Sequence, residues 1–488
     1  MKPDFADLFT RPFWLDEWHT NLIGNRETIG QVFSDLHHGS DFGPPLVHLI
    51  AWLLARITGE ITPVEARIAS LLSVVSAVVF VALILRRRFG IAGSVAGALA
   101  VASNQLVVAH AFELRFYCLW LFCAAGFAWA LGVEGDKVSS RRRDTAVAIF
   151  SILLCMTHWL AVLSLGLMCV GGMASFGRDW RAGLRRVLPA VAGFIVLAIS
   201  SPLVFGQRGS ITEKSWMADV TFGNFLSTVS LFWGGTVLVF TVIVILIGFL
   251  RHQTKEPLKT SFRVAARDPG VVALLSLFAV PLMMLVVSIK QPAMHHRYSI
   301  TTLLAWAPLV AIAVHSYGKI VRSVFYVVLL FFLWVSTLQM ALEASRFAYS
   351  AGVGKRALAQ ACGMNLPVVF EVRHLMYPST SGSSRRWARC DTRYLAMSNA
   401  SLDRMFPRSN MPRFFRIENE FALLHGRLYG YPRVSTQAQL DSAPRFLLVG
   451  WDDSFPIGYK NVEKFGQAVF PHHRATRVNE DLTLFERR

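Results

Sequence analysis

Long hydrophobic runs separated by short polar loops occupy most of the first 341 residues of the chain. Eight of these runs approach the roughly 20 residues that an α-helix needs to cross a bilayer. They are residues 65–85, 90–109, 114–133, 187–205, 225–250, 270–289, 299–316 and 319–341. The pattern therefore predicts an all-α polytopic membrane protein.

A ninth hydrophobic run, residues 145–176, is too long for one span and short for two. As a single helix it would be about 48 Å long, whereas the hydrocarbon core is about 30 Å thick. Basic clusters flank it on both sides, "KVSSRRR" (137–143) and "RDWRAGLRR" (178–186). Clustered basic loops stay cytoplasmic. Both flanks can be inside only if the chain crosses twice, so we predict two short spans that turn near His158 and Trp159, and ten spans in all.

Composition agrees with this reading, because 53% of residues are hydrophobic and only 16% are charged, against about 25% charged in soluble chains. The net charge of +18 is concentrated in loops that the ten-span topology places on one side. The loops 86–88, 137–143, 178–186, 251–267 and 319–322 hold 18 Lys and Arg residues, and the loops 206–224 and 290–298 on the other side hold two each. Anionic lipid headgroups are thus the expected partners of this charge, and nucleic acid is not.

The same topology places residues 1–64 on the outer face of a cell (inner) membrane. Nothing before Asp16 resembles a signal or a spanning helix. Either a preceding N-terminal span is missing from this sequence, which is what we expect, or the chain inserts in an unusual way. Pro44 and Pro45 suit the start of a helix over about 46–58. That helix is too short to span, and we expect it to lie along the membrane interface.

The chain becomes polar from about residue 343. Segments 366–372, 444–452 and 481–486 have the pattern of strands, and 355–363 that of a helix, which predicts a small extracytoplasmic α/β domain. We divide the chain into an outer loop (1–64), a helix bundle (65–341) and this domain (342–488). Four cysteines inside the spans serve as small apolar residues, namely Cys118, Cys123, Cys155 and Cys169. Cys362 and Cys390 lie in the polar part, where a disulfide is one option and is not required by the sequence.

Several nucleotide and metal motifs are missing or out of context. The sequence has no GxxxxGK[ST], which argues against a P-loop ATPase. "GVGKRA" (352–357) imitates a dinucleotide-binding turn, but a membrane helix precedes it instead of a strand. No HExxH or paired CxxC is present. We therefore predict no cofactor; a divalent metal has no support in the sequence.

Acidic residues on the predicted outer face, in the first loop and at the outer end of two spans, are candidates for chemistry. Asp16 and Glu17 stand side by side in "RPFWLDEWHT", and Glu113 lies in "AHAFELRFY". Carboxylates at a membrane boundary are costly and tend to be functional. The alternative is that they are solvated loop acids, which their aromatic neighbours argue against.

A third outer segment, "QPAMHHRYSI", brings His295, His296, Arg297 and Tyr298 to the start of a span. Arginine offers a planar fork of donors that matches phosphate. Tyr298 has an alternative reading as an interface anchor, and His158 one as a buried core histidine. Carboxylates facing such a cluster suit chemistry on a lipid-linked phosphate, in which a base takes a proton from an acceptor hydroxyl and cations stabilise the departing phosphate. They also suit a proton-coupled transporter.

The order of these motifs resembles that of the bacterial membrane glycosyltransferases of the GT-C superfamily. The stretches that carry the resemblance are "FWLDEWHT", "FGPPLVHLIAWLLARITG", "VEARIASLLSVVSAVVFVALILRRRFG", "AFELRFY" and "HHRYSI". They run from about residue 13 to 341, with a looser match beyond. The pattern is most similar to protein O-mannosyltransferases and to lipid A aminoarabinose and galacturonic acid transferases.

The resemblance implies a polyprenyl-phosphate sugar donor, an extracytoplasmic active site and inversion at the anomeric carbon. It places the general base at Asp16, with Glu17 beside it, and a second acidic position at Glu113, followed by Arg115 and Tyr117. Arg297 and Tyr298 would approach the donor phosphate. From their places in the sequence we add His295 and His296 to the donor side, and His158 with Arg115 and Tyr117 to substrate binding. The sugar, a hexose or a pentose, and the acceptor, a glycan, lipid or protein, stay open.

Two functions from other classes remain as alternatives. A transporter or flippase of a lipid-linked sugar would commonly show repeated halves and helices broken at corresponding Gly or Pro positions, and the sequence shows neither. A membrane scaffold with a sensory outer domain would leave the carboxylates unexplained.

Overall fold

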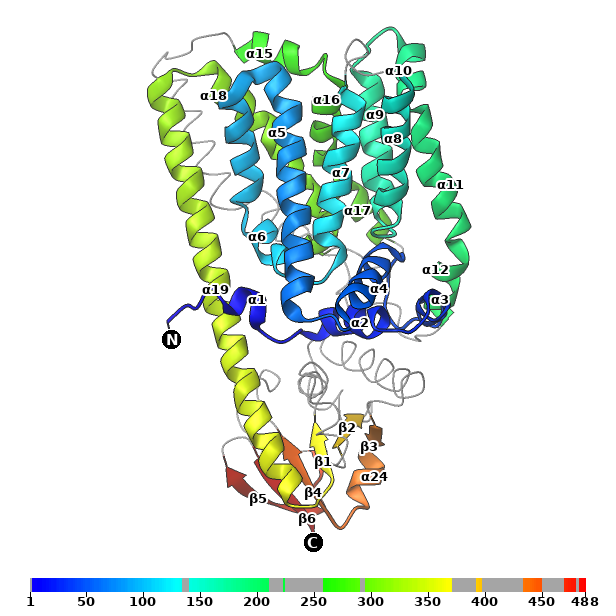
Figure 1. Ribbon diagram of the computed structural model, residues 1–488, viewed down its shortest axis with the longest axis vertical. Coiled ribbons are helices and arrows are strands. Elements are labelled where there is room, and N and C mark those ends of the chain that lie inside the picture. Colours follow the sequence, from blue (N-terminus) through cyan, green and yellow to red (C-terminus); the bar gives the residue numbers. More distant parts are fainter. Residues whose placement is uncertain are drawn as a thin grey trace.

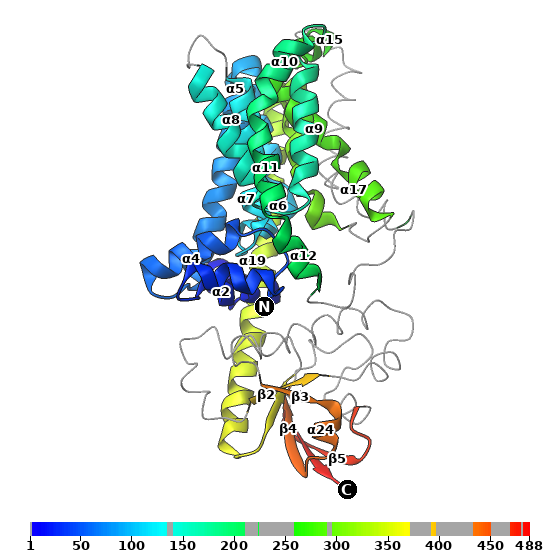
Figure 2. The same ribbon diagram turned by 90° about the vertical axis from the view of Figure 1, so that its right-hand side faces the viewer.

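The computed structural model describes residues 2–133, 140–209, 258–289, 295–370, 392–396, 433–449, 469–479 and 482–488, with Gly223. A helix bundle forms one part of the molecule, a layer of short N-terminal helices crosses one end of it, and a β-sheet lies beyond that layer (Figure 1). The N-terminal layer consists of α1 (Asp7–Thr10), α2 (Leu15–Gly24), α3 (Ile29–His37) and α4 (Leu46–Thr58). Figure 2 shows the same order from the side.

Helix α5 (Pro63–Ala102) is a hairpin of two helices that folds back at Gly90. The backbone there has φ 64° and ψ −168°, a conformation that glycine adopts without a steric penalty. Ser94 donates a hydrogen bond of 2.8 Å to the carbonyl of Ala82, whereas a straight helix would separate these residues by about 18 Å. The sequence runs 65–85 and 90–109 are therefore separate helical segments, joined next to the Arg86–Arg88 cluster.

The next helices are α6 (Gln105–Ala111) and α7 (Phe116–Gly132), which meet at an angle of 116°. Residues 112–115 form the corner between them. Ser70 holds this corner by donating to the carbonyl of Glu113, and Arg67 donates to the carbonyl of Phe112 over 3.1 Å. The bend places Glu113 and Arg115 at the end of the bundle that the N-terminal helices cover.

The run 145–176 is divided where the sequence predicts. Helix α8 (Ser140–Cys155) ends before His158, α9 (Ala161–Ala174) begins after it, and the two pack against each other (Figure 1). The bundle continues through further helical segments: α10 (Trp180–Val187), η1 (Leu188–Ala190), α11 (Val191–Ile199), α12 (Ser201–Gly209), α15 (Leu258–Ala265), α16 (Pro269–Ser276), η2 (Leu277–Ala279), α17 (Val280–Ser288), η3 (His296–Ala305), α18 (Trp306–Ser316) and α19 (Lys319–Gly363).

Among the described residues, five helices are long and apolar enough to cross a membrane, or six if α6 and α7 form one span. That count treats the α5 hairpin as one helix. The molecule is mostly helical and is an integral membrane protein. Ten spans stay a prediction, and one of them, 225–250, lies outside the described residues. The basic helices α10 and α15 lie at the end of the bundle opposite to α2 (Figure 1).

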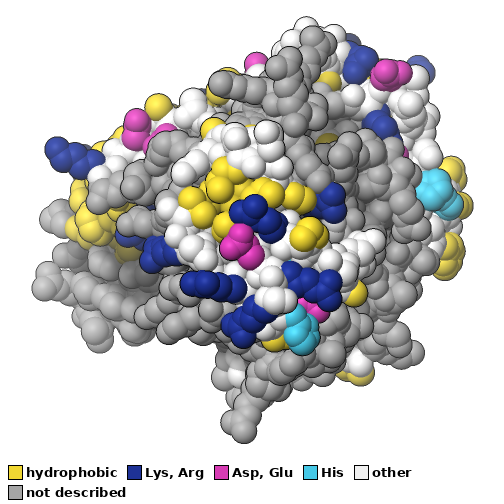
Figure 3. Space-filling model, turned by 90° about the horizontal axis from the view of Figure 1, so that it is seen from below, with side chains coloured by type: hydrophobic (Ala, Val, Ile, Leu, Met, Phe, Trp, Pro, Cys, Tyr) yellow, Lys and Arg dark blue, Asp and Glu magenta, His cyan; other side chains and the backbone are white. Residues whose placement is uncertain are grey.

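The C-terminal part contains a six-stranded mixed sheet of order β3-β2-β1-β4-β6-β5. Its strands are β1 (Val368–Phe370), β2 (Thr392–Ala396), β3 (Arg433–Thr436), β4 (Arg445–Val449), β5 (His473–Asn479) and β6 (Leu482–Arg487), and α24 (Gln437–Asp441) connects β3 to β4. The first four strands in this list pair in parallel, whereas β6 pairs antiparallel with β4 and β5. Seen from below, the sheet end shows basic side chains beside a hydrophobic patch (Figure 3).

Three predicted strands, 366–372, 444–452 and 481–486, coincide with β1, β4 and β6. The helix predicted over 355–363 is confirmed as the last part of α19, which runs unbroken from the bundle to the sheet (Figure 1). Residues 343–354 contain no proline that would stop it. The domain boundaries themselves stay a prediction.

Helix α4 begins directly after Pro45, as predicted from the proline pair. Cys118, Cys123 and Cys155 are buried free thiols, and Cys169 is a partly buried one. Cys362 is disulfide-bonded, and Cys390 lies outside the described residues.

Candidate active site

Asp16 and Arg297 form an ion pair at the end of the bundle that carries the N-terminal helices. Asp16 lies in the first turn of α2 and Arg297 in the first turn of η3, 281 positions later. The guanidinium Nη1 donates to Asp16 Oδ2 over 3.0 Å. The two side chains are 27% and 17% exposed, so this pair remains in reach of a ligand.

Aromatic rings surround the Arg297 guanidinium. Its central carbon lies 5.7 Å from the ring centre of Trp14 and 5.9 Å from that of Tyr117, close enough for cation–π attraction. The backbone N–H of Arg297 donates to His295 Nδ1 over 3.2 Å. Arg297 is thus held by rings and by its own turn, with its charge directed toward Asp16.

A column of stacked rings continues from Arg297 into the bundle. Tyr298 stacks on His158 with ring centres 5.0 Å apart, and His158 stacks on Trp120 at the same separation. His158 Nδ1 accepts the backbone N–H of Leu160, which leaves the ring proton on Nε2. His295 and His296 pack against each other beside this column, with ring centres 4.0 Å apart.

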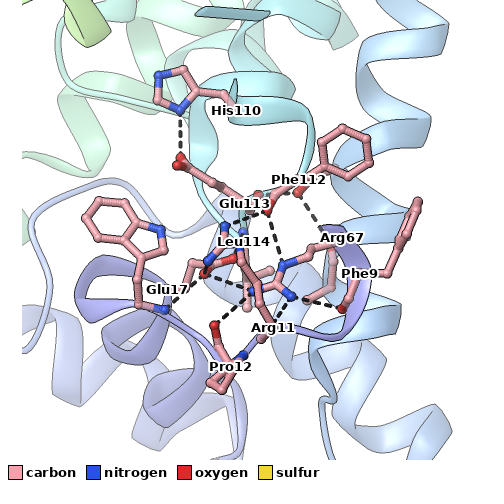
Figure 4. A network of polar contacts seen from close by, with 12 residues as sticks. Phe9, Arg11, Pro12, Glu17, Arg67, His110, Phe112, Glu113 and Leu114 are labelled. Atoms are coloured by element: carbon pink, nitrogen blue, oxygen red, sulfur yellow. Dashed lines mark hydrogen bonds and ion pairs between the residues drawn. The ribbon is translucent and has the colours of Figure 1, made fainter. Parts of the chain in front are cut away.

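Glu17, the neighbour of Asp16, has a different environment. Its side chain has no exposed surface. Oε2 accepts from Arg11 (3.2 Å), Arg67 (3.3 Å) and the N–H of Trp14 (3.1 Å), and Oε1 accepts from the N–H of Leu114 (2.9 Å). Figure 4 shows this network. Glu17 therefore caps α2 and joins it to the corner between α6 and α7.

The two arginines of this network also bind backbone carbonyls. Arg67 donates to Phe9 and Pro12, and both Arg67 and Arg11 donate to Phe112, all within 3.1 Å. Arg67 has no exposed surface although it lies one turn into α5. The segment before α2 and the α6–α7 corner are thereby fixed relative to α5 (Figure 4).

Glu113 belongs to the same corner and pairs with a histidine. Its Oε2 lies 2.6 Å from His110 Nδ1 (Figure 4). The His110 ring in turn packs on Tyr117, with ring centres 4.2 Å apart. Among the described residues, His110 Nε2 is buried without a hydrogen-bond partner, so a ligand atom could bond to it.

Arg115 lies behind Asp16 in a second buried cluster. Its Nη1 donates to Asp41 Oδ2 (2.7 Å), to the carbonyl of Asp16 (2.9 Å) and to Thr20 Oγ1 (3.0 Å). His48 Nε2 lies 3.0 Å from Asp41 Oδ2. Burial disfavours the charged form of Asp41, but the Arg115 guanidinium and the His48 hydrogen bond outweigh it and hold the pKa of this carboxyl well below its ordinary value.

His19, one turn from this cluster, is held in its neutral form. Burial lowers the pKa of its imidazole to about 4, although Asp41 and Asp16 oppose this shift. Near neutral pH the cluster behind Asp16 therefore contains a charged Arg115–Asp41 pair beside a neutral imidazole.

The structure connects all ten residues singled out in the sequence. One group is built around the Asp16–Arg297 pair and the ring column, a second around Glu113, and Glu17 and Arg115 hold the backbone behind them. The connected set is Asp16, Glu17, Glu113, Arg115, Tyr117, His158, His295, His296, Arg297 and Tyr298.

Five further residues of the site were missed from the sequence: Arg11, Asp41, His48, Arg67 and His110. Arg67 interrupts an otherwise apolar stretch, and Asp41 and His48 flank the proline pair. Charged residues beside or inside apolar runs were the available signal, because such residues need buried partners. The described residues contain no group of three His, Cys, Asp or Glu that could hold a metal ion.

No protein-family model matches the chain, and no curated protein matches its sequence. Its structure is similar to two crystal structures of ArnT from Cupriavidus metallidurans, one in the apo state and one bound to undecaprenyl phosphate. Each covers 99% of this chain and 95% of the ArnT chain, with a TM-score of 0.57 and 13% sequence identity. The chain has the fold of ArnT. This likeness agrees with the fold expected from the sequence, and at this identity it concerns the fold alone.

Proposed function

We propose that the protein is an inverting glycosyltransferase that moves a sugar from a polyprenyl-phosphate donor to a hydroxyl of an extracytoplasmic lipid, glycan or protein. The observation that carries this proposal is the Asp16–Arg297 pair: a carboxylate within 3.0 Å of a guanidinium at one end of an ArnT-like bundle. A general base and a phosphate-binding cation are the two groups that such a transfer needs.

In the proposed reaction the acceptor oxygen attacks the anomeric carbon from the face opposite the phosphate. Asp16 takes the hydroxyl proton as the new C–O bond forms. The bond between the anomeric carbon and the phosphate oxygen breaks, and its electron pair leaves with the polyprenyl phosphate. Arg297 stabilises the charge on this leaving group. A single displacement of this kind inverts the anomeric configuration.

The surroundings of the two carboxylates favour Asp16 over Glu17 as the base. Glu17 is fully buried and accepts four hydrogen bonds, so its oxygens are already occupied. Asp16 is partly exposed, and its carboxylate pairs with Arg297, the residue that we assign to binding the donor phosphate. Glu113, held by His110, is placed to orient the acceptor.

The remaining assignments follow from this arrangement. Tyr298 follows Arg297 in the sequence and packs near His295, and we assign Tyr298, His295 and His296 to the donor phosphate side. The Tyr117 ring centre lies 5.9 Å from the Arg297 guanidinium, and we assign Tyr117 to substrate binding. Stacking by His158 holds Tyr298. We further propose that the chain crosses an inner membrane ten times, with the sheet as an extracytoplasmic α/β domain on the side of Asp16. No cofactor is part of the mechanism.

The experiment uses the full chain in lipid nanodiscs with a panel of undecaprenyl-phosphate sugars, hexoses and pentoses, and envelope extract as acceptor. We expect one donor to be consumed and undecaprenyl phosphate to be released, in the wild type and not in Asp16→Asn. Binding of donors without consumption of any of them would instead favour a flippase. An Asp16→Asn variant that consumes donor at the wild-type rate would reject the mechanism.

A further inference from the structure

A buried cluster of Thr20, Asp41, His48 and Arg115 lies behind Asp16. It holds the backbone of Asp16, whereas the ion pair with Arg297 holds the side chain. The Asp16 carboxylate bonds to Arg297, whereas its backbone carbonyl accepts a hydrogen bond of 2.9 Å from Arg115. A donor phosphate that binds Arg297 would compete for the guanidinium and loosen the first contact. The second contact would remain, because Arg115 is buried and lies behind α2.

Asp41 determines where the Arg115 guanidinium lies. It accepts from Nη1 over 2.7 Å and from Nη2 over 3.5 Å. Its own position is fixed by His48 on α4, 3.0 Å away, and by the backbone N–H of Phe42, 2.7 Å away. Thr20 bridges the cluster, since its hydroxyl lies 3.0 Å from Arg115 Nη1 and 3.4 Å from the Asp16 carbonyl.

This cluster is anchored to the bundle as well as to α4. Gln207 at the end of α12 donates to the carbonyl of Gly43 over 3.0 Å, and the N–H of Leu46 donates to the carbonyl of Met156 over 3.1 Å. The loop that carries Asp41 thus connects the start of α2 to the α8–α9 turn, which also carries His158. An anchored hydrogen-bond partner behind a catalytic base keeps the base oriented while the groups that contact its carboxylate change.

We propose that Asp41 is a positioning residue for the transfer reaction: through Arg115 it holds the backbone of Asp16, so that the carboxylate stays aimed at the acceptor once the donor phosphate has taken Arg297. This inference rests on the proposed function. Within the part of the chain that the structure describes, Asp41 forms no hydrogen bond or ion pair with Arg297 or with the ring column, and its direct partners are Thr20, Phe42, His48 and Arg115. Its effect should therefore fall mainly on the rate and not on donor binding.

The experiment compares Asp41→Asn with Asp35→Asn in nanodiscs. Asp35 is a matched control, because it is also buried and pairs with Arg26 through contacts of 2.6 and 3.0 Å, and none of its hydrogen bonds within the described part of the chain goes to Asp16. Both substitutions remove a buried carboxylate charge and should lower the melting temperature. Only Asp41→Asn should lower kcat, by roughly 10- to 100-fold as expected for a misplaced catalytic group, with KM for the donor unchanged.

A second variant keeps the test decisive if Asp41→Asn does not fold. Thr20→Val preserves shape, buries no unpaired charge and removes a hydroxyl that bridges Arg115 and Asp16. It should lower kcat by less than Asp41→Asn, again at constant KM. Equal kcat in Asp41→Asn and Asp35→Asn, or a normal kcat in Thr20→Val where Asp41→Asn does not fold, would overturn the inference. A wild type that consumes no donor would instead reject the proposed function.

Discussion

Replacing Glu17 by glutamine should destabilise the protein strongly, because this carboxylate neutralises two buried guanidiniums. Arg11 and Arg67 lie 3.2 and 3.3 Å from Oε2, and neither Glu17 nor Arg67 has exposed side-chain surface. Removing one partner of a buried charge network costs about 3–5 kcal/mol. Glutamine also loses hydrogen bonds, because both oxygens of Glu17 accept N–H donors. The NH₂ group that replaces one of these oxygens cannot accept, and it would face an N–H group.

Glu65→Gln is the matched control for this substitution. Glu65 occupies the same position of a capping box at the start of α5, and among the described residues its carboxylate accepts only the exposed N–H of Thr62, over 3.1 Å. Glutamine can make the same bond in a capping box. We therefore expect a change within about 0.5 kcal/mol for Glu65→Gln, as for surface substitutions in general.

The assay is reversible unfolding in mixed micelles, followed by tryptophan fluorescence, for the wild type and both variants. The predicted order places Glu17→Gln several kcal/mol below Glu65→Gln, on the scale given above. If the two variants unfold at the same denaturant concentration, the Glu17 network does not stabilise the fold and its assignment as a structural residue is wrong.

Three further outcomes follow from the site. Arg297→Ala should weaken binding of undecaprenyl phosphate by about 1.5–3 kcal/mol, or roughly ten- to a hundredfold, and Arg297→Lys by less; unchanged affinity in both would remove Arg297 from the donor site. Asp16→Asn should lose at least about 10²-fold in transfer rate but bind undecaprenyl phosphate more tightly, since Asp16 no longer competes for Arg297. This gain in affinity should vanish when Arg297 is also replaced, in an Arg297→Gln background. If it came only from the loss of repulsion between the Asp16 carboxylate and the phosphate, it would persist there. The depressed pKa of Asp41 implies stability that is complete above its ordinary value of 3.8 and lost as the pH falls below it, so the wild type should lose melting temperature below about pH 4 more steeply than Asp41→Asn.

The candidate residues Asp16 and Arg297 could be predicted from the sequence because their types and places already limit their roles. Asp16 stands among aromatic residues in the outer loop and Arg297 directly before an apolar run, where a charge is costly and a partner is needed. The helix break at His158 could be predicted from charge, since basic clusters on both sides of 145–176 require two crossings. In the same way Arg86–Arg88 marks the turn of the α5 hairpin.

The supporting residues could not be predicted in this way. Glu17 and Asp16 are adjacent carboxylates, and only the orientation of the first turn of α2 decides that one is buried and the other is not. Asp41 lies in a polar loop where a solvated aspartate would look the same in sequence. Its partner Arg115 is 74 positions away, and no local pattern reports a contact across that distance.

The central claim is that this chain transfers a sugar from a polyprenyl-phosphate donor, and mass spectrometry of cells tests it most directly. The measurement compares envelope glycans and polyprenyl-linked sugars in a strain that lacks the gene, complemented with the wild type or with Asp16→Asn. We predict that the deletion strain lacks one sugar modification and accumulates the corresponding polyprenyl-phosphate sugar, that the wild type restores both, and that Asp16→Asn restores neither. Identical glycans and lipids in all strains, or full restoration by Asp16→Asn, would contradict the account.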